Sequence, residues 1–556
     1  MSSRERGLLF TLWLLATALN VAKPYHIDDT FYLEQARWIA AHPDRPTSGL
    51  VFWEGEAPAP FHRVGNHAPL VPALQAMVIA AFGDSSIALH LLTSVFTAIA
   101  ILLLHTLAKR HAPRPDDETV PLVVTALVIL SPAFVAEQNV MLDVPLLCAW
   151  LAFFVALDHM PRPSACLAAG AALALALLVK LGSVVLFVTL VIEAVRAWRA
   201  RSISPVVVAL SLAIPIGALG LWALASLEEV GEISFLSRGL DALSPTVDRS
   251  MLESAGIGLG RSGLFVIVLG GIAPALAVLL PFHLLSARGP RALALACGAI
   301  VVLSIGARLA VSSVAHAHHL DALADEPLAH AVLRVIDLVL GAGMLALALS
   351  RARSGDAIDR RLALWLGVGA CAAIGLAPFL AARHVLLVLA PAWLLLARAE
   401  LLVVPRVRTA ALVLGSAIGI AAAIADHRMA TVYAEQAPRL HDQARRGAPT
   451  GRVYAVGHWG WQEHARAAGL DTYLPGTTDL AIGDVLIEPE GVHAQRILEA
   501  DRARLEALDT LDVDAGPLDL VRTLVDREGL YVSWLGLPWS LRTDRVERFV
   551  VHSVAR

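Results

Sequence analysis

The sequence HIDDTFY at residues 26–32 decides how this chain is interpreted, because it places two carboxylates directly after an apolar run. That run, residues 7–22, is suited to be the first membrane helix. A carboxylate close to hydrocarbon is costly, so such groups are functional by default. Asp28 or Asp29 could instead cap a helix that begins at Thr30, since aspartate favours that position. The rest of the chain decides between a helix cap and a site.

The composition is that of a polytopic α-helical membrane protein. Of its 556 residues, 57% are hydrophobic and only 17% are charged, whereas soluble domains carry about 25% charged residues. Runs suited to span hydrocarbon recur throughout residues 1–426, and we expect about thirteen transmembrane helices. They lie near residues 7–22, 85–108, 119–136, 141–158, 165–179, 181–198, 205–227, 262–286, 291–313, 327–350, 361–380, 383–400 and 408–426. No basic stripe suggests a nucleic-acid partner.

Arginine and lysine are concentrated in every second loop. Residues 351–361 carry four arginines, for example, whereas the turn 137–140 and the loop 314–326 carry no arginine or lysine. By the positive-inside rule the N-terminus is cytoplasmic, and thirteen helices place the C-terminus outside the cytoplasm. We therefore expect a multi-pass protein of the inner or plasma membrane.

The chain is expected to form two domains. Residues 1–426 make up the transmembrane domain, whose first outer loop, residues 23–84, is far longer than an ordinary connection. Residues 30–41 within it suit a helix on the membrane surface. Residues 427–556 combine short β-like runs with helical stretches near 460–468 and 491–508, which predicts a small extracytoplasmic α/β domain.

Other polar residues fall where the outer ends of helices are expected. They are Glu137–Asn139, Asp143, Lys180, Arg383 and His384. Each alone is explained by snorkelling or internal pairing. Together they outline a charged cavity that opens outward.

A second polar cluster lies in the loop 314–330, which contains four histidines and three acidic residues. A metal site is one interpretation, but the spacing matches no defined motif. We favour a solvated loop. The four cysteines lie in apolar runs without metal-ligand spacing, so they are expected to be small buried hydrophobic residues.

Six segments, in order along the chain, resemble motifs of the GT-C superfamily of membrane glycosyltransferases, in particular its GT39 branch of protein mannosyltransferases and aminoarabinose transferases. The segments are Asp28–Tyr32, Asn66–Leu70, Met141–Pro145, Leu178–Gly182, Arg383-His384 followed by Pro391, and Gly457–Gln462. The chain departs from the branch in having Asp29 where Glu is common, His67 or Ala68 where aminoarabinose transferases carry Lys, and His384 where Tyr is frequent.

The resemblance implies transfer of a sugar from a polyprenyl-phosphate donor to a lipid, glycan or protein acceptor on the outer face of the membrane. Asp28 is then expected to be the general base, because an acceptor hydroxyl must lose a proton as it attacks. Asp29 is secondary, and Asp143 would orient the acceptor or a divalent cation; the alternative role of Asp143 is the nucleophile of a retaining reaction. Direct attack inverts the anomeric centre, since retention needs a nucleophilic carboxylate. Apart from such a cation, no cofactor is expected.

The leaving phosphate needs cations more than a general acid. Arg383 is the first candidate, because a guanidinium binds phosphate through two hydrogen bonds. Lys180 and His67 come next. Tyr32, four residues after Asp28 and on the same helix face, and His384 complete the expected substrate-binding set.

Two other functions are compatible with the sequence. A transporter or lipid flippase would also be polytopic, but transporters tend to show internal repeats and polar groups near the midplane. A non-catalytic membrane protein could bind a partner through residues 427–556, with Gly457–Gln462 as a simple turn between a strand and a helix.

Overall fold

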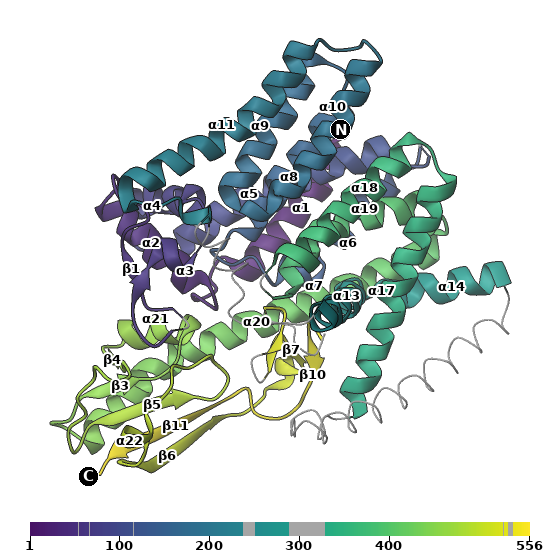
Figure 1. Ribbon diagram of the computed structural model, residues 1–556. Helices are drawn as coiled ribbons and strands as arrows, with labels where there is room; N and C mark the ends of the chain where they lie inside the picture. The colour runs from purple at the N-terminus through teal and green to yellow at the C-terminus, as the bar shows by residue number, and fades with distance from the viewer. Residues whose placement is uncertain are drawn as a thin grey trace.

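The computed structural model describes residues 1–555 except 54, 66, 115, 237–250, 289–327, 378, 526–527 and 532–536. A bundle of helices fills most of the molecule, and a mixed β-sheet lies beside one end of it (Figure 1). The longer bundle helices are α1 (Ser3–Asn20), α4 (Leu70–Phe82), α5 (Ser86–His111), α6 (Thr119–Ile129), α8 (Asp143–Asp158), α9 (Pro163–Val179), α10 (Leu186–Arg199), α11 (Pro205–Val230), α13 (Met251–Gly271), α14 (Leu276–Arg288), α17 (Leu328–Ser354), α18 (Ala357–Cys371), α19 (Ala382–Arg398) and α20 (Pro405–Gly447). Shorter elements are α2 (Asp29–Ala41), β1 (Leu50–Val51), β2 (Ala59–Pro60), α3 (Phe61–Val64), α7 (Pro132–Val135), the 3₁₀ turn η1 (Leu181–Val185) and the π-helical turn η2 (Ala372–Leu376).

Several helices are long enough to cross a membrane, but the expected number of spans is not confirmed. Among the described residues, five helices are long and apolar enough, or six if the bent pair α13–α14 forms one span. The expected span 291–313 lies outside the described residues. The chain is thus a multi-pass membrane protein, and the described residues do not confirm the expected number of about thirteen transmembrane helices.

Two of the expected spans are broken for local reasons. The run 119–136 is divided at Ser131 and Pro132, so α6 has only 11 residues, about 16 Å, against a hydrocarbon core of about 30 Å. The run 262–286 bends by 92° between α13 and α14. Gly270, Gly271 and Pro274 lie next to this bend, and such residues cannot sustain a regular helix.

Helix α19 is the centre of the bundle. All 17 of its residues are buried, and it packs against α6, α8, α13, α17 and α18. A helix that is apolar on every side is stable only when it is surrounded by other elements. The N-terminus of α19 therefore holds Arg383 and His384 inside the protein rather than in lipid or bulk water.

The two ends of the bundle differ in how their charged side chains are paired. At the end away from the sheet, arginines of the Arg-rich segments form ion pairs with buried or half-buried acids. These pairs join Arg361 to Glu193 (3.2 Å), Arg408 to Asp117 (2.9 Å) and Arg398 to Asp359. At the other end, near the sheet, lie the residues singled out from the sequence.

The C-terminal part contains the expected mixture of strands and helices around a five-stranded sheet. Its strand order is β4-β3-β5-β11-β6; β3 is parallel to β4 and β5, and β11 is antiparallel to β5 and β6. The elements are β3 (Val453–Ala455), α21 (Trp459–Ala467), β4 (Asp471–Thr472), β5 (Val485–Pro489), α22 (Glu499–Arg502), β6 (Leu505–Val513), η3 (Pro517–Asp519), β7 (Val521–Arg522), β8 (Leu524–Val525), β9 (Glu528–Gly529), β10 (Ser540–Leu541) and β11 (Glu547–Val554). The helix expected near 491–508 is wrong: only α22 forms there, because residues from Leu505 onward pair with β11.

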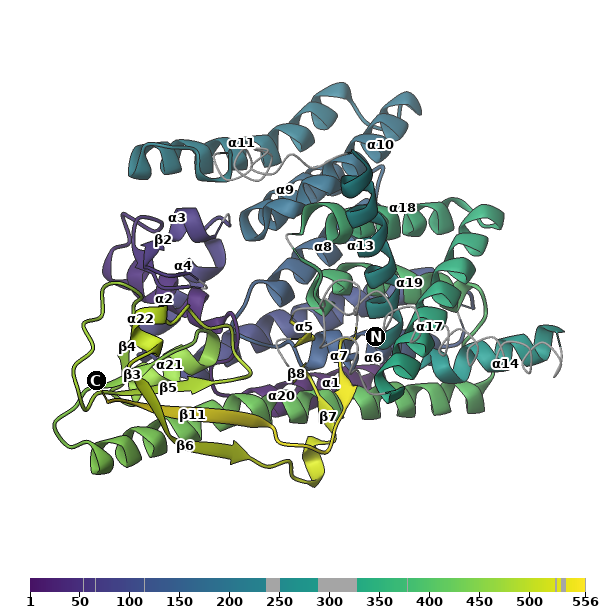
Figure 2. The ribbon, with the colours of Figure 1, turned by 60° about the horizontal axis from the view of Figure 1, so that its bottom comes forward.

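Helix α20 crosses the expected domain boundary at residue 426 without a break. It continues for a further 21 residues, to Gly447, and passes from the bundle to the sheet (Figures 1 and 2). Tyr433 from this extension packs against Trp461 of α21 and Phe549 of β11. The two parts thus share a helix and a continuous hydrophobic core.

The first outer loop is held against the C-terminal part by helix α21. Thr30 donates a hydrogen bond to the Trp459 carbonyl (2.8 Å), and Gln462 donates to the Phe52 carbonyl (2.9 Å). A Cβ on Gly460 would lie 2.7 Å from the Tyr25 carbonyl oxygen, so only glycine permits this approach. The expected helix at 30–41 is confirmed as α2, and its position depends on these contacts.

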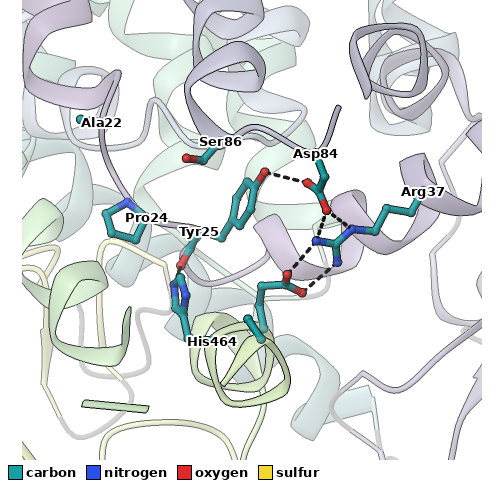
Figure 3. A pocket seen from close by; sticks show the side chains of 9 residues that line it. Ala22, Pro24, Tyr25, Arg37, Asp84, Ser86 and His464 are labelled. Atoms are coloured by element: carbon teal, nitrogen blue, oxygen red, sulfur yellow. Dashed lines mark hydrogen bonds and ion pairs between the residues drawn. The ribbon is translucent and has the colours of Figure 1, made fainter. Parts of the chain in front are cut away.

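A bidentate ion pair strengthens the same junction. Arg37 donates to both carboxylate oxygens of Glu463 at 2.8 and 3.0 Å, an arrangement stronger than a single hydrogen bond. Arg37 also donates to Asp84 (2.6 Å), which accepts from the Tyr25 hydroxyl (3.2 Å). Figure 3 shows this network at a pocket between the outer loop and α21. The volume of this pocket is about 400 Å³.

A fully buried ion pair joins three parts of the chain at this end of the bundle. Lys23, directly after α1, contacts Asp426 of α20, and both side chains are 0% exposed. Lys23 also donates to Asn139 (2.5 Å) and to the Ala136 carbonyl (3.1 Å). Asp426 accepts further hydrogen bonds from Thr523 (2.8 Å) and Tyr531 (2.6 Å). The pair therefore connects the outer loop, the turn after α7 and the C-terminal part.

We predict that Asp426→Asn strongly destabilises the protein, because it leaves the Lys23 ammonium buried without a counter-charge. Loss of one partner of a buried ion pair typically costs about 3–5 kcal/mol. The measurement is the thermal unfolding midpoint of the detergent-purified protein. Glu490→Gln is the control, since its pair with Arg545 is 47% and 41% exposed and is expected to contribute at most about 1 kcal/mol. Equal shifts for the two variants would contradict this role of the pair.

Candidate active site

Asp28 and Asp29 have different roles in the structure, although they are adjacent in sequence. Asp29 is fully buried, and its Oδ2 accepts a hydrogen bond from the backbone N–H of His26 at 2.8 Å. Asp28 stands at the N-cap position of α2 but makes no capping hydrogen bond with its side chain. Asp29 therefore stabilises the turn before α2, and the Asp28 carboxylate is available for another contact.

That contact is with Arg383, from the N-terminus of α19. Arg383 Nη2 lies 2.8 Å from Asp28 Oδ2. The Asp28 side chain is 21% exposed and Arg383 is 6% exposed. The two residues are 355 positions apart in sequence, so only the packing of the outer loop onto α19 brings them together.

Strained backbone precedes Asp28. Ile27 has a φ of +44°, which is rare for a β-branched residue and costs about 1–3 kcal/mol. The hydrogen bond from His26 to Asp29 and the bond between His464 and the Tyr25 carbonyl (3.0 Å) fix the segment on both sides. Such strain is maintained by the surroundings and is found most often at functional sites.

Arg383 has hydrogen-bonding capacity that the protein does not use. Its Nη1 is buried and has no hydrogen-bond partner among the described residues. Its guanidinium lies 5.6 Å from the centre of the Phe379 ring, and the carboxylates that act on it most strongly are Asp28, Asp143 and Glu137. An unsatisfied buried donor calls for an explanation, and an anionic ligand would satisfy it.

Asp143 and Lys180 form a second pair in the same cluster. Asp143 lies in the first turn of α8, and Lys180 lies at the break between α9 and η1; Lys180 Nζ and Asp143 Oδ1 are 3.4 Å apart. The structure thus brings together four predicted residues: Asp28 with Arg383, and Asp143 with Lys180. Tyr32 is buried on α2, and its hydroxyl group interacts electrostatically with Asp28, Asp143 and Arg383.

The remaining predicted residues take less central positions. His384 is buried beside Arg383, with its ring 5.6 Å from that of Phe379. His67 lies half-buried in the loop between α3 and α4. Burial raises the pKa of Asp29 to about 7, a value that would suit a base at neutral pH, but the Asp29 carboxylate is enclosed and its Oδ2 holds the loop.

Sequence reasoning did not assign a role to several residues that the structure places here. In the sequence Glu137 is one of several polar groups near helix ends. In the structure it lies in the turn between α7 and α8, and its carboxyl group interacts electrostatically with Arg383 and Asp143. Arg261 of α13 donates to the Ala377 carbonyl in the segment that leads to α19. Lys23 and Asp426 were not singled out. A charge at the edge of an apolar run was the available signal for each of them.

The motif Gly457–Gln462 serves to dock the two parts of the molecule. It runs from the end of β3 into α21, and His458 bonds to Gln462 at 3.2 Å. Burial lowers the pKa of His458 to about 4, so the ring is neutral near pH 7 and is a poor phosphate ligand. The Phe52 ring contacts His458 at 4.7 Å between centroids. The motif is therefore a turn, and one that fixes the outer loop.

No metal centre is found in the part of the chain that the structure describes. There, no three His, Cys, Asp or Glu side chains are grouped as metal ligands. Most of the polar loop 314–330 lies outside the described residues, and only its end, including His330, belongs to α17.

One protein family matches part of the chain. Residues 66–221 match the profile of the dolichyl-phosphate-mannose-protein mannosyltransferases. The matched region runs from α4 into α11 and contains Asp143 and Lys180, but it includes neither Asp28 nor Arg383. No curated protein matches the chain.

Solved membrane transferases are distantly similar. ArnT from Cupriavidus metallidurans, solved with undecaprenyl phosphate, is 15% identical over 87% of this chain and 91% of its own, with a TM-score of 0.39. The oligosaccharyltransferase AglB from Archaeoglobus fulgidus is 12% identical over 84% and 63%, with a TM-score of 0.44. The protein O-mannosyltransferase Pmt1-Pmt2 of S. cerevisiae is 14% identical over 42% and 34%, with a TM-score of 0.31.

TM-scores this low carry no argument about what the chain does. What the comparisons support is therefore the family match alone. Over residues 66–221 the chain is similar to the dolichyl-phosphate-mannose-protein mannosyltransferases, a family of membrane glycosyltransferases.

Proposed function

We propose that the protein transfers a sugar from a polyprenyl-phosphate donor to an acceptor hydroxyl on the outer face of the membrane. The observation that carries the proposal is the 2.8 Å contact between Asp28 and Arg383. It places a carboxylate that can accept a proton beside a cation that can bind phosphate. The name of the matching family, which includes a dolichyl-phosphate sugar, supports a lipid-linked donor.

Arg383 is the proposed phosphate ligand. A guanidinium can form two parallel hydrogen bonds to phosphate oxygens, and Nη1 of Arg383 is buried without a partner among the described residues. The N-terminus of α19 adds partial positive charge at the same place. Lys180 supplies a second cation, held near the cluster by Asp143. A leaving phosphate needs this kind of charge stabilisation.

Asp28 is the proposed general base. Its charge is balanced by Arg383, and the donor phosphate would compete with it for the guanidinium. The carboxylate would then accept the proton of the acceptor hydroxyl as that oxygen bonds to the anomeric carbon. The bond from this carbon to the phosphate oxygen breaks, and polyprenyl phosphate leaves. One such displacement inverts the anomeric centre.

The supporting residues follow from this arrangement. Tyr32 and His384 would contact the substrate beside Asp28 and Arg383, respectively, and His67 would approach from the loop before α4. Asp143 would orient the acceptor or a divalent cation. A flippase would share the membrane fold, but the family match favours an enzyme over a transporter.

We predict that Asp28→Asn reduces turnover by about 10²–10⁴-fold, because asparagine cannot accept a proton at neutral pH. Binding of the lipid-linked donor should persist, since the phosphate ligand is Arg383. The assay measures transfer of labelled sugar by purified protein. Asp29→Asn retains an oxygen for the His26 N–H and should lose far less activity. High activity of Asp28→Asn together with an inactive Asp29→Asn would reverse the assignment within the pair.

We predict that Arg383→Lys weakens donor binding by about 10- to 100-fold, the equivalent of losing one charge-assisted hydrogen bond. Lysine preserves the charge but not the planar fork of donors. Donor affinity is measured by titration of the purified protein, and exposed Arg545→Lys is the control. Unchanged affinity in Arg383→Lys would remove Arg383 as the phosphate ligand.

The proposed orientation can be tested separately. With the N-terminus in the cytoplasm, a reporter fused after Arg201 should be cytoplasmic, and a reporter fused at the C-terminus should lie outside. The physical basis is the concentration of arginine in every second loop. Reporters on the same side of the membrane would refute this topology and the outward location of the site.

A further inference from the structure

Glu137 is the exception in an otherwise well-bonded turn. It lies between α7 and α8 and is 4% exposed. Both of its carboxyl oxygens are buried and have no hydrogen-bond partner among the described residues. Its neighbours are partnered: Gln138 accepts from Thr97 (2.8 Å), and Asn139 binds Lys23 and Tyr531. An unsatisfied buried carboxyl group is destabilising, so its presence calls for an explanation.

The surroundings of Glu137 point to a ligand. Of the charged groups, Arg383 and then Asp143 act on it most strongly. Arg383 itself has an unpartnered, buried Nη1. An unused hydrogen-bond acceptor and an unused donor thus occur in one charged cluster, together with the Asp28 carboxylate.

The chemistry of a buried carboxyl group suits a sugar. Burial raises the pKa of Glu137 well above its usual range, which favours the protonated form. A protonated carboxyl group has one O–H donor and an acceptor oxygen. A sugar hydroxyl likewise donates one hydrogen bond and accepts others. Glu137 can therefore donate a hydrogen bond to a sugar hydroxyl and accept one from it, whereas a phosphate dianion could only accept hydrogen bonds.

We propose that Glu137 binds hydroxyl groups of the donor sugar while Arg383 binds the phosphate to which that sugar is attached. The inference depends on the proposed function, since it assigns the sugar subsite of the same donor. Glu137 is then a specificity-determining residue. Because Asp28 also contacts Arg383, the anomeric carbon would lie between the sugar subsite and the base.

The experiment compares two probes on each purified full-length variant. One probe is undecaprenyl phosphate, which contains the leaving group alone. The other is a panel of undecaprenyl-phosphate hexoses and pentoses, from which the member that wild type binds most tightly is used. The ratio of the two affinities isolates the contribution of the sugar. The thermal unfolding midpoint is measured on the same samples.

We expect Glu137→Leu to reduce this affinity ratio by about 10-fold, the equivalent of one to two hydrogen bonds, with binding of undecaprenyl phosphate unchanged. Glu137→Gln can still donate and accept and should stay within about 3-fold of wild type. The unfolding midpoint of Glu137→Leu should not fall, because the change removes an unpaired polar group from a buried position.

The matched control is Gln138→Leu. Gln138 is the adjacent buried polar residue, but its amide has partners, so this variant should lower the unfolding midpoint and leave the affinity ratio intact. If the affinity ratio of Glu137→Leu equals that of wild type, the inference is wrong. It is also wrong if the unfolding midpoint of Glu137→Leu falls and the variant loses the same affinity for both probes. If wild type binds no sugar-bearing probe more tightly than undecaprenyl phosphate, the proposed function fails and the inference fails with it.

Discussion

The buried contact between Lys23 and Asp426 is the constraint on which the outer end of this protein depends. Both side chains are completely enclosed, and removing charges from water is expensive unless each charge is paired and further hydrogen-bonded. The structure meets this requirement with Asn139, Thr523 and Tyr531. Because Lys23 and these partners come from three distant parts of the chain, the ion pair can form only when the outer loop, the bundle and the C-terminal part are assembled. The position of Asp28, five residues after Lys23, follows from that assembly.

The candidate site combines a cation and an acid that both have unpartnered polar atoms. At the opposite end of the bundle, arginines form direct ion pairs with acids, although some buried atoms there, such as Arg361 Nε and Asp158 Oδ2, also have no hydrogen-bond partner among the described residues. Near the sheet, Arg383 has an unpartnered nitrogen and Glu137 two unpartnered oxygens within the described structure. Ile27 has a strained backbone next to Asp28. Unsatisfied groups and strain reduce stability, and a folded protein retains them where they serve a ligand or a reaction. Here they occur near one cation, Arg383, on which the carboxylates of Asp28, Asp143 and Glu137 act.

The C-terminal part is an integral support of the site. Helix α21 fixes α2 through Trp459 and Glu463, and it fixes the outer loop at Phe52 through Gln462. The Leu530 carbonyl accepts a hydrogen bond from Ala382 N–H (2.8 Å), at the first residue of α19. The next residue, Tyr531, reaches Asp426. The same segment therefore contacts the N-terminus that holds Arg383 and the network that holds the outer loop. A boundary between independent domains at residue 426 does not describe this arrangement, because α20 continues through it.

The sequence by itself determined the class of protein, the helical character of residues 1–426 and the family resemblance, and it indicated Asp28, Asp143, Lys180 and Arg383 as candidate site residues. Apolar runs and charges near their ends are local signals that need no knowledge of packing. The tertiary structure decided which of Asp28 and Asp29 faces Arg383, because their difference arises from one hydrogen bond to His26 and from the approach of α19. It also decided the breaks at Pro132 and near Gly271, the continuity of α20 and the isolation of Glu137. Each of these depends on which distant groups come within hydrogen-bonding distance, and a linear pattern does not encode such distances.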